Sequence, residues 1–241
     1  MRVVLAQRLM RSMTDDTPSL PGASNLRHTP TWVFDLDNTL YHGVHGLFEQ
    51  IDVRMRQYLS KFLDVDEDEA YRVQKSYFRE YGTTLRGMMV NYKMDPKPYL
   101  NFVHDIDITA IPPNPALDAV LKTLPGRKLI FTNADLAHAE RVLTRLGITD
   151  HFDGVFDIKD ADFVPKPEPE VYDRLVGRFD FDPTQAVMVE DIARNLKPAR
   201  ALGMTTVWVR PVTECDICKE DPEGDHVDIE TDDLVGWLES L

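Results

Sequence analysis

The stretch TWVFDLDNT, residues 31–39, decides the fold: it is a short apolar run that ends at two aspartates. Residues 31–34 are β-branched or aromatic without polar alternation, which is typical of a strand buried on both faces of a parallel sheet. Asp35 and Asp37 follow where this strand is expected to end. Similar runs recur farther along the chain, at residues 128–132, 186–191 and 205–209. These runs predict the strands of one sheet.

Helical patterns alternate with the predicted strands. Residues 136–146 place their apolar side chains on one face and stop at Gly147, a typical helix end. Residues 195–202 form a second candidate, with Gly203 just past its end. Strands and helices in this order predict an α/β fold: a doubly wound, Rossmann-like parallel sheet with right-handed crossovers.

A long interruption separates the first strand from the second. A crossover needs about a dozen residues, far fewer than this interruption contains. Its sequence predicts helices at 47–63 and 67–81 and two shorter ones up to His104. We therefore expect an inserted helical cap at 43–112 and an α/β core at 31–42 and 113–241, after a disordered leader at 1–30. Within the core, residues 211–230 read as an acidic, irregular tail and 232–241 as a short helix.

Charge and cysteine content restrict the partners. The 241 residues carry a formal net charge of −14, which disfavours binding to a nucleic-acid polymer but permits a small phosphorylated substrate. No stretch approaches the roughly 18 apolar residues of a membrane span, so no membrane partner is expected. Two cysteines give no disulfide framework, which favours the cytoplasm. Cys215 and Cys218 form half of a zinc site or a redox pair, or simply two thiols in an acidic loop; the last is favoured because a second such pair is missing.

Polar residues follow the predicted strands. Ligands of open parallel sheets bind beyond the carboxyl ends of the strands, so these residues should converge there. They are Asp35, Asp37, Thr132, Asn133, Glu190 and Asp191, and the loop at 164–169 adds Lys166 to the set. Lys166 lies between prolines that suit a stiff loop. Several carboxylates at one edge need a compensating charge, and a hard dication such as Mg²⁺ provides it.

This set of residues suits phosphoryl transfer. A carboxylate beside Mg²⁺ can attack phosphorus and form an acyl phosphate, and Asp35 is the nucleophile candidate. Asp37 would protonate the leaving group and then deprotonate water. Asp191 would hold the metal, Thr132 would bind a phosphoryl oxygen, and Lys166 would offset the negative charge of the transition state.

The same residues resemble the four motifs of the haloacid dehalogenase superfamily. Residues 35–39 (DLDNT) resemble the first motif, Thr132-Asn133 the second, Lys166 the third, and Glu190-Asp191 with Asn195 the fourth. The resemblance covers about residues 31–210. It implies that Asp35, Asp37 (through its backbone carbonyl) and Asp191 bind the metal, with Asn133 at the substrate phosphate. Thr39, Glu190 and Asn195 are expected behind these ligands. Many members have an aspartate where Asn195 stands, so Asn195 is expected to orient the ligands rather than bind the metal, with Glu190 helping through water.

A narrower resemblance lies in the predicted cap. Residues 81–88 (YGTTLRGM) and 91–93 (NYK) are similar to the pyrimidine 5′-nucleotidase subgroup. It implies that a nucleoside monophosphate is recognised by Tyr81, Arg86, Tyr92 and Lys93, the tyrosines by stacking and the basic residues by charge.

Three functions are therefore open. The first is a Mg²⁺-dependent phosphatase of pyrimidine nucleoside 5′-monophosphates, working as a monomer or homodimer. The second is a phosphosugar or phosphoglycolate-type phosphatase or a phosphomutase. The third is a catalytically silent nucleotide-binding module on the same fold. A dehalogenase would not need Asp37 and Asp191 together with a metal.

Overall fold

The computed structural model describes residues 26–211 and 225–241, and the sheet occupies its centre. All six strands of this sheet run parallel, in the order β3-β2-β1-β4-β5-β6. Their bounds are β1 Thr31–Phe34, β2 Arg127–Phe131, β3 Gly154–Phe156, β4 Ala186–Glu190, β5 Thr205–Val209 and β6 Ile229–Thr231. The predicted doubly wound α/β fold is thus confirmed, with the decisive stretch as a central strand.

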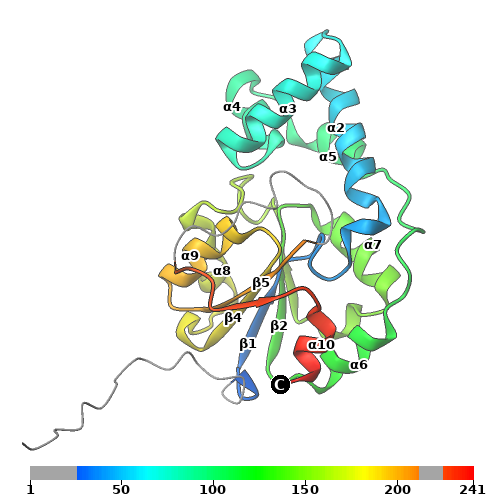
Figure 1. Ribbon diagram of the computed structural model, residues 1–241. Helices are drawn as coiled ribbons and strands as arrows, with labels where there is room; N and C mark the ends of the chain where they lie inside the picture. Colours follow the sequence, from blue (N-terminus) through cyan, green and yellow to red (C-terminus); the bar gives the residue numbers. More distant parts are fainter. Residues whose placement is uncertain (1–25, 212–224) are drawn as a thin grey trace, which may run out of the picture.

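Helices cover both faces of the sheet (Figure 1). Successive side chains of a strand point to opposite faces, so β1 divides between two apolar clusters. Trp32 and Phe34 pack with α6 (Pro115–Thr123), α7 (Leu136–Leu146) and α10 (Leu234–Glu239). Val33 packs on the other side with α8 (Pro169–Phe179) and α9 (Leu196–Ala201). Burial on both faces explains the uninterrupted apolar runs of the strands.

Four α-helices separate β1 from α6, and we call them the cap helices. Their bounds are α2 Leu47–Leu63, α3 Glu67–Tyr81, α4 Thr84–Tyr92 and α5 Pro96–Val103. The side chains of Asp66, Thr83 and Asp95 accept backbone N–H groups at the starts of α3, α4 and α5. The predicted cap helices therefore form, and Figure 1 shows them stacked beyond one end of the sheet.

Several elements depart from the sequence-based expectations. Strands β3 and β6 and helices α6 and α8 were not among the predicted elements. Strand β6 begins within the tail, 211–230, that was expected to be irregular, and ends one residue beyond it. The end of the expected leader, residues 26–30, belongs to the described chain, and Leu26 packs in the core. The rest of the leader, Cys215 and Cys218 lie outside the described residues. None of the helices in the described ranges is both long and apolar enough to cross a membrane.

Candidate active site

The backbone brings the predicted polar residues to one edge of the sheet. Asp35 directly follows β1, and its N–H donates to the carbonyl of Val189 in β4 at 2.9 Å. Thr132 directly follows β2, and its N–H donates to the carbonyl of Phe156 in β3 at 3.0 Å. Glu190 ends β4. Because the strands are parallel and in register, their carboxyl ends converge as expected.

Lys166 supplies a buried cation at this edge. Its Nζ lies 2.7 Å from Asp35 Oδ1 and 2.6 Å from Glu190 Oε2, and donates to the Phe131 carbonyl at 2.9 Å. The lysine side chain is 1% exposed. Burial lowers the pKa of Lys166, but the two carboxylates more than offset this effect, so its pKa lies above the ordinary value. The lysine is therefore a fixed positive charge beside Asp35.

One lysine does not neutralise the three carboxylates around it. Ligand atoms of Asp35, Glu190 and Asp191 lie within 4.8 Å of one another, and all three residues are buried. Burial and the charge of Glu190 raise the pKa of Asp35 to about 7 and that of Asp191 well above its ordinary value. Asp191 Oδ2 is buried without a hydrogen-bond partner among the described residues. An orphaned carboxylate oxygen beside two further carboxylates fits a hard divalent cation with oxygen ligands.

Asp37 lies in a different environment from Asp35. His138 Nε2 is 2.8 Å from Asp37 Oδ1, and the Tyr41 hydroxyl donates to the same oxygen at 2.6 Å. Burial raises the pKa of Asp37, but the attraction of His138 and these hydrogen bonds outweigh it and lower the pKa to about 2. The two aspartates of the first motif thus have different partners, and their pKa values are shifted in opposite directions.

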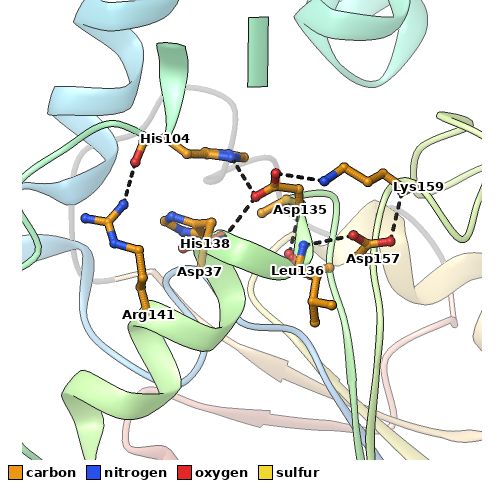
Figure 2. Close-up of polar contacts among 10 residues, drawn as sticks. Asp37, His104, Asp135, Leu136, His138, Arg141, Asp157 and Lys159 are labelled. Atoms are coloured by element: carbon orange, nitrogen blue, oxygen red, sulfur yellow. Dashed lines mark hydrogen bonds and ion pairs between the residues drawn. The ribbon is translucent and has the colours of Figure 1, made fainter. Parts of the chain in front are cut away.

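A second polar network adjoins Asp37 (Figure 2). Asp135, the N-cap of α7, lies between His104 Nδ1 and Lys159 Nζ, each 3.1 Å from one of its oxygens. His104 follows α5 of the cap helices and stacks on His138, with ring centroids 4.6 Å apart. Arg141 donates to the His104 carbonyl at 2.7 Å. The network therefore joins the cap helices to α7 of the core.

The remaining predicted core residues support this arrangement. The Thr39 hydroxyl donates to Asp35 Oδ2 at 3.0 Å, and Thr132 Oγ1 accepts from Ala134 N. Asn133 Oδ1 accepts the Lys166 N–H at 2.8 Å, so the Asn133 side chain secures the lysine loop. Asn195 is buried, and its carbonyl accepts the Tyr172 hydroxyl.

The site opens into a cavity between the sheet edge and the cap helices. On the core side it is lined by Asp35, Asp37, Thr132, Asn133, Lys166, Glu190, Asp191 and Asn195. Its cap side is largely apolar, with Phe48, Phe78 and Tyr99 beside a polar cluster. In this cluster Asp52 Oδ1 accepts from Gln74 Nε2 at 2.8 Å and pairs with Lys75.

The cap residues predicted from the resemblance lie elsewhere. Among the described residues, the lining of the cavity does not include Tyr81, Arg86, Tyr92 or Lys93. The ring of Tyr81 packs edge-on to Tyr77, and that of Tyr92 to Phe62. Lys93 is exposed at the end of α4. Thr83, Thr84 and Leu85 of the same motif do line the cavity, because neighbours in a short motif face different sides of a helix.

His138, Tyr41 and His104 were not predicted. The amphipathic pattern of 136–146 concealed His138, because a histidine in a first helical turn resembles any other polar residue. The available signal was its position in the helix that directly follows the second motif.

Comparison with known proteins agrees with this geometry. The model of the haloacid dehalogenase-like hydrolase family matches residues 30–203. Phosphate metabolism protein 8 of Saccharomyces cerevisiae is 31% identical over 211 residues, which cover 78% of this chain. Fructose-1-phosphate phosphatase YqaB of Escherichia coli is 35% identical over 112 residues, or 45% of this chain. The aligned regions span 63% and 57% of the length of these two relatives.

Solved structures agree at the level of the fold. L-2-haloacid dehalogenase from Xanthobacter autotrophicus superposes with a TM-score of 0.57 at 16% identity, covering 87% of this chain and 96% of that enzyme. The family model spans more than half of this chain and includes the site residues from Asp35 to Asn195. The chain therefore belongs to the haloacid dehalogenase-like hydrolase family.

Proposed function

We propose that this chain is a Mg²⁺-dependent phosphate monoester hydrolase whose substrate is a nucleoside 5′-monophosphate of the pyrimidine class. The observation that carries the proposal is the buried cluster of Asp35, Lys166, Glu190 and Asp191 beside a separately held Asp37. Asp35 lies in the cluster with Lys166, whereas His138 and Tyr41 hold Asp37 apart from it, so the two carboxyl groups are placed for the different roles of nucleophile and acid/base.

The proposed reaction has two steps. The Asp35 carboxylate attacks phosphorus, the bond from phosphorus to the leaving oxygen breaks, and Asp37 gives that oxygen a proton. Water then attacks the aspartyl phosphate, Asp37 takes a proton from the water, and inorganic phosphate leaves with Asp35 restored. Lys166 balances the added negative charge, and Thr132 donates to a phosphoryl oxygen.

The metal ligands would be Asp35, Asp191 and the backbone carbonyl of Asp37, with Glu190 and Asn195 behind them. Bound there, Mg²⁺ would neutralise phosphoryl oxygens that the surrounding carboxylates otherwise repel. The orphaned Asp191 oxygen supports this assignment.

The lining of the cavity is an argument for a substrate with an aromatic part. We propose that the cap helices, within residues 43–112, hold the base: Phe48 and Phe78 offer apolar faces, and Gln74 with Asp52 and Lys75 offers hydrogen-bonding groups. Tyr81, Arg86, Tyr92 and Lys93 remain the prediction of the sequence resemblance. We further propose a cytoplasmic monomer or homodimer.

Relatives favour a second candidate, hydrolysis of a small sugar phosphate. The E. coli relative is named a fructose-1-phosphate phosphatase, and the aligned region includes less than half of this chain. A sugar phosphate would bring hydroxyl groups to the cap side of the cavity, where most of the lining is apolar.

The test is phosphate release from a panel of monoesters, with Mg²⁺ and with EDTA. The panel holds UMP, CMP, dUMP, AMP, GMP, phosphoglycolate and hexose phosphates. The proposal expects Mg²⁺-dependent release that is fastest from the pyrimidine nucleotides. Faster release from sugar phosphates would transfer the assignment to the second candidate. A folded, metal-loaded protein that binds nucleotide without turnover would favour a silent binding module.

Asp35→Asn tests the nucleophile in the same assay. We expect a rate loss of at least about 10⁴-fold with the fold retained, because an amide cannot form the acyl phosphate. Near-normal turnover by a folded variant would contradict the mechanism.

A further inference from the structure

The carboxylate of Asp37 is held from a distant part of the chain. His138 lies 101 residues away in sequence, in the first turn of α7, and its Nε2 is 2.8 Å from Asp37 Oδ1. The His138 side chain is fully buried, whereas that of Asp37 is 19% exposed. A buried imidazole thus reaches the carboxylate from behind, on the side away from solvent.

Both hydrogen bonds to Asp37 end on the same oxygen. Tyr41 and His138 approach Oδ1 from different elements, at 2.6 and 2.8 Å. Within the described chain no hydrogen bond to Oδ2 is found. Because two partners fix one oxygen, the plane of the carboxylate is fixed as well, and the second oxygen is left for the substrate.

The His138 ring is itself held in place. Its backbone N–H donates to the N-cap carboxylate of Asp135, and its ring stacks on His104 with an interplanar angle of 25°. Asp135 also pairs with His104, and Figure 2 shows these groups side by side around the start of α7. The stack restrains the ring from the cap side and the helix start restrains its backbone.

The proton of the His138 ring can be assigned to one nitrogen. His138 Nδ1 is buried, and the described residues offer it no hydrogen-bond partner. A buried N–H without an acceptor is costlier than an unpaired lone pair, so the proton belongs on Nε2, facing Asp37. Nε2 donates to Asp37 in this way whether the ring is neutral or charged.

We propose that His138 is a positioning residue that orients Asp37 so that its Oδ2 delivers the proton to the leaving oxygen. The proposal rests on the proposed phosphatase function. In the step concerned, the bond from phosphorus to the leaving oxygen breaks, Asp37 loses one proton to that oxygen, and it regains one from the attacking water. His138 changes no bond order and acts only through the direction of Asp37.

Leaving-group dependence distinguishes this role from a purely structural one. p-Nitrophenolate departs without help from an acid, whereas phenolate is a poorer leaving group and benefits from protonation. A variant with a misdirected Asp37 should therefore fail most on the poorer leaving group, while general instability would affect both esters equally. General acid catalysis contributes about 10²- to 10⁴-fold, so the effect is measurable.

The experiment measures kcat and KM for p-nitrophenyl phosphate and phenyl phosphate, with Mg²⁺, on the full chain. For His138→Leu we expect kcat/KM to fall at least about tenfold more with phenyl phosphate than with p-nitrophenyl phosphate, mainly through kcat. His138→Gln keeps an N–H near the position of Nε2 and should recover most of the loss. His151→Leu is the matched control, because it breaks a His–Asp pair of 2.6 Å with Asp118 outside the cavity.

Several results would overturn the inference. Equal losses on both esters, no loss, or a glutamine variant no better than leucine would each show that His138 does not direct Asp37. If His138→Leu does not fold, His138→Asn serves instead, because its amide is too short to reach Asp37 in the same geometry. A wild-type protein that releases phosphate from neither ester would contradict the proposed function itself.

Discussion

Lys166 is the residue on which the balance of charge in the site depends. It contacts Asp35 and Glu190 at once, and all three side chains are buried. Removing a buried cation leaves its partners with uncompensated charge, which costs more than the ion pair contributes when intact. Asn133 secures the backbone of this lysine, so the position of the charge depends on a residue of the second motif.

Lys166→Met should therefore be destabilising as well as inactive. We expect a loss of about 3 to 5 kcal/mol in the free energy of unfolding, measured by urea denaturation, because two buried carboxylates lose their cation. Arg174→Met is the control, since its pair with Asp162 is exposed and should contribute less than about 1 kcal/mol. Equal stability of the two variants would contradict the proposed role of Lys166.

At the scale of elements, the cap helices are held by close packing as well as by capping residues. Gly87 lies in α4 where a Cβ would come within 2.4 Å of Cγ of Tyr77 in α3. The absence of a side chain at this position allows the two helices to approach. Gly177, in α8, faces open space: apart from its chain neighbours and the backbone of its own helix, no atom lies within 4 Å of where a Cβ would stand.

Two Gly→Ala substitutions should consequently act in opposite directions. Gly87→Ala should lower the free energy of unfolding by about 1 to 3 kcal/mol through overpacking. Gly177→Ala should raise it by up to about 1 kcal/mol, because alanine favours the helix more than glycine does. Thermal and urea unfolding measure both, and a neutral Gly87→Ala would show that α3 and α4 separate easily.

One variant on the cavity side of the cap helices can be compared with one on their exposed side. Phe78 lines the cavity, whereas Tyr92 is 47% exposed and belongs to the nucleotidase-like motif. If the cavity holds the base, Phe78→Leu should raise KM for UMP several-fold, because it loses about 1 kcal/mol of contact with the base. Tyr92→Leu should leave KM for UMP unchanged. The same variants assayed with p-nitrophenyl phosphate provide the control. A larger rise in KM for UMP in Tyr92→Leu than in Phe78→Leu would favour the motif residues, and not the cavity lining, as the site that binds the base.

At the scale of the whole molecule, the sheet edge and the cap helices enclose carboxylates that repel one another. The raised pKa values of Asp35 and Asp191 mean that the folded protein without metal binds protons more tightly than the unfolded chain does. Protonated Asp35 and Asp191 therefore contribute to the free energy of unfolding at low pH. This contribution decreases as the pH rises from the ordinary carboxyl range through about 7. A divalent cation would compete with those protons.

Mg²⁺ should thus stabilise the protein more at high pH than at low pH. We expect MgCl₂ to raise the melting temperature relative to EDTA, and by more near about pH 8 than near about pH 5. The corresponding gain in the free energy of unfolding is about 2.7 kcal/mol at 100 times Kd. Asp191→Asn should remove most of the increment. An increment that is independent of pH, or retained in Asp191→Asn, would place the cation elsewhere.

The sequence by itself determined the sheet, the helical insertion and the acidic edge. The apolar runs of residues 31–34 and 186–189 are local signals of doubly buried strands, and parallel strands bring the residues after them together whatever the loops do. Asp35 and Asp191 could be predicted for this reason, whereas Lys166 was predicted from its proline-rich loop and its resemblance to the third motif. Short elements such as β3, with three residues, carry too little pattern to be recognised.

Only the tertiary structure decided what surrounds Asp37 and which cap residues face the site. The approach of His138 to Asp37 depends on how α7 packs beside β1, and the stack with His104 depends on where α5 ends. The inward face of the cap depends likewise on how α2 and α3 turn over the sheet edge, which placed Phe78 and Gln74 at the cavity and left Tyr92 outside. Contacts between residues distant in sequence follow from packing, and local pattern does not encode their partners.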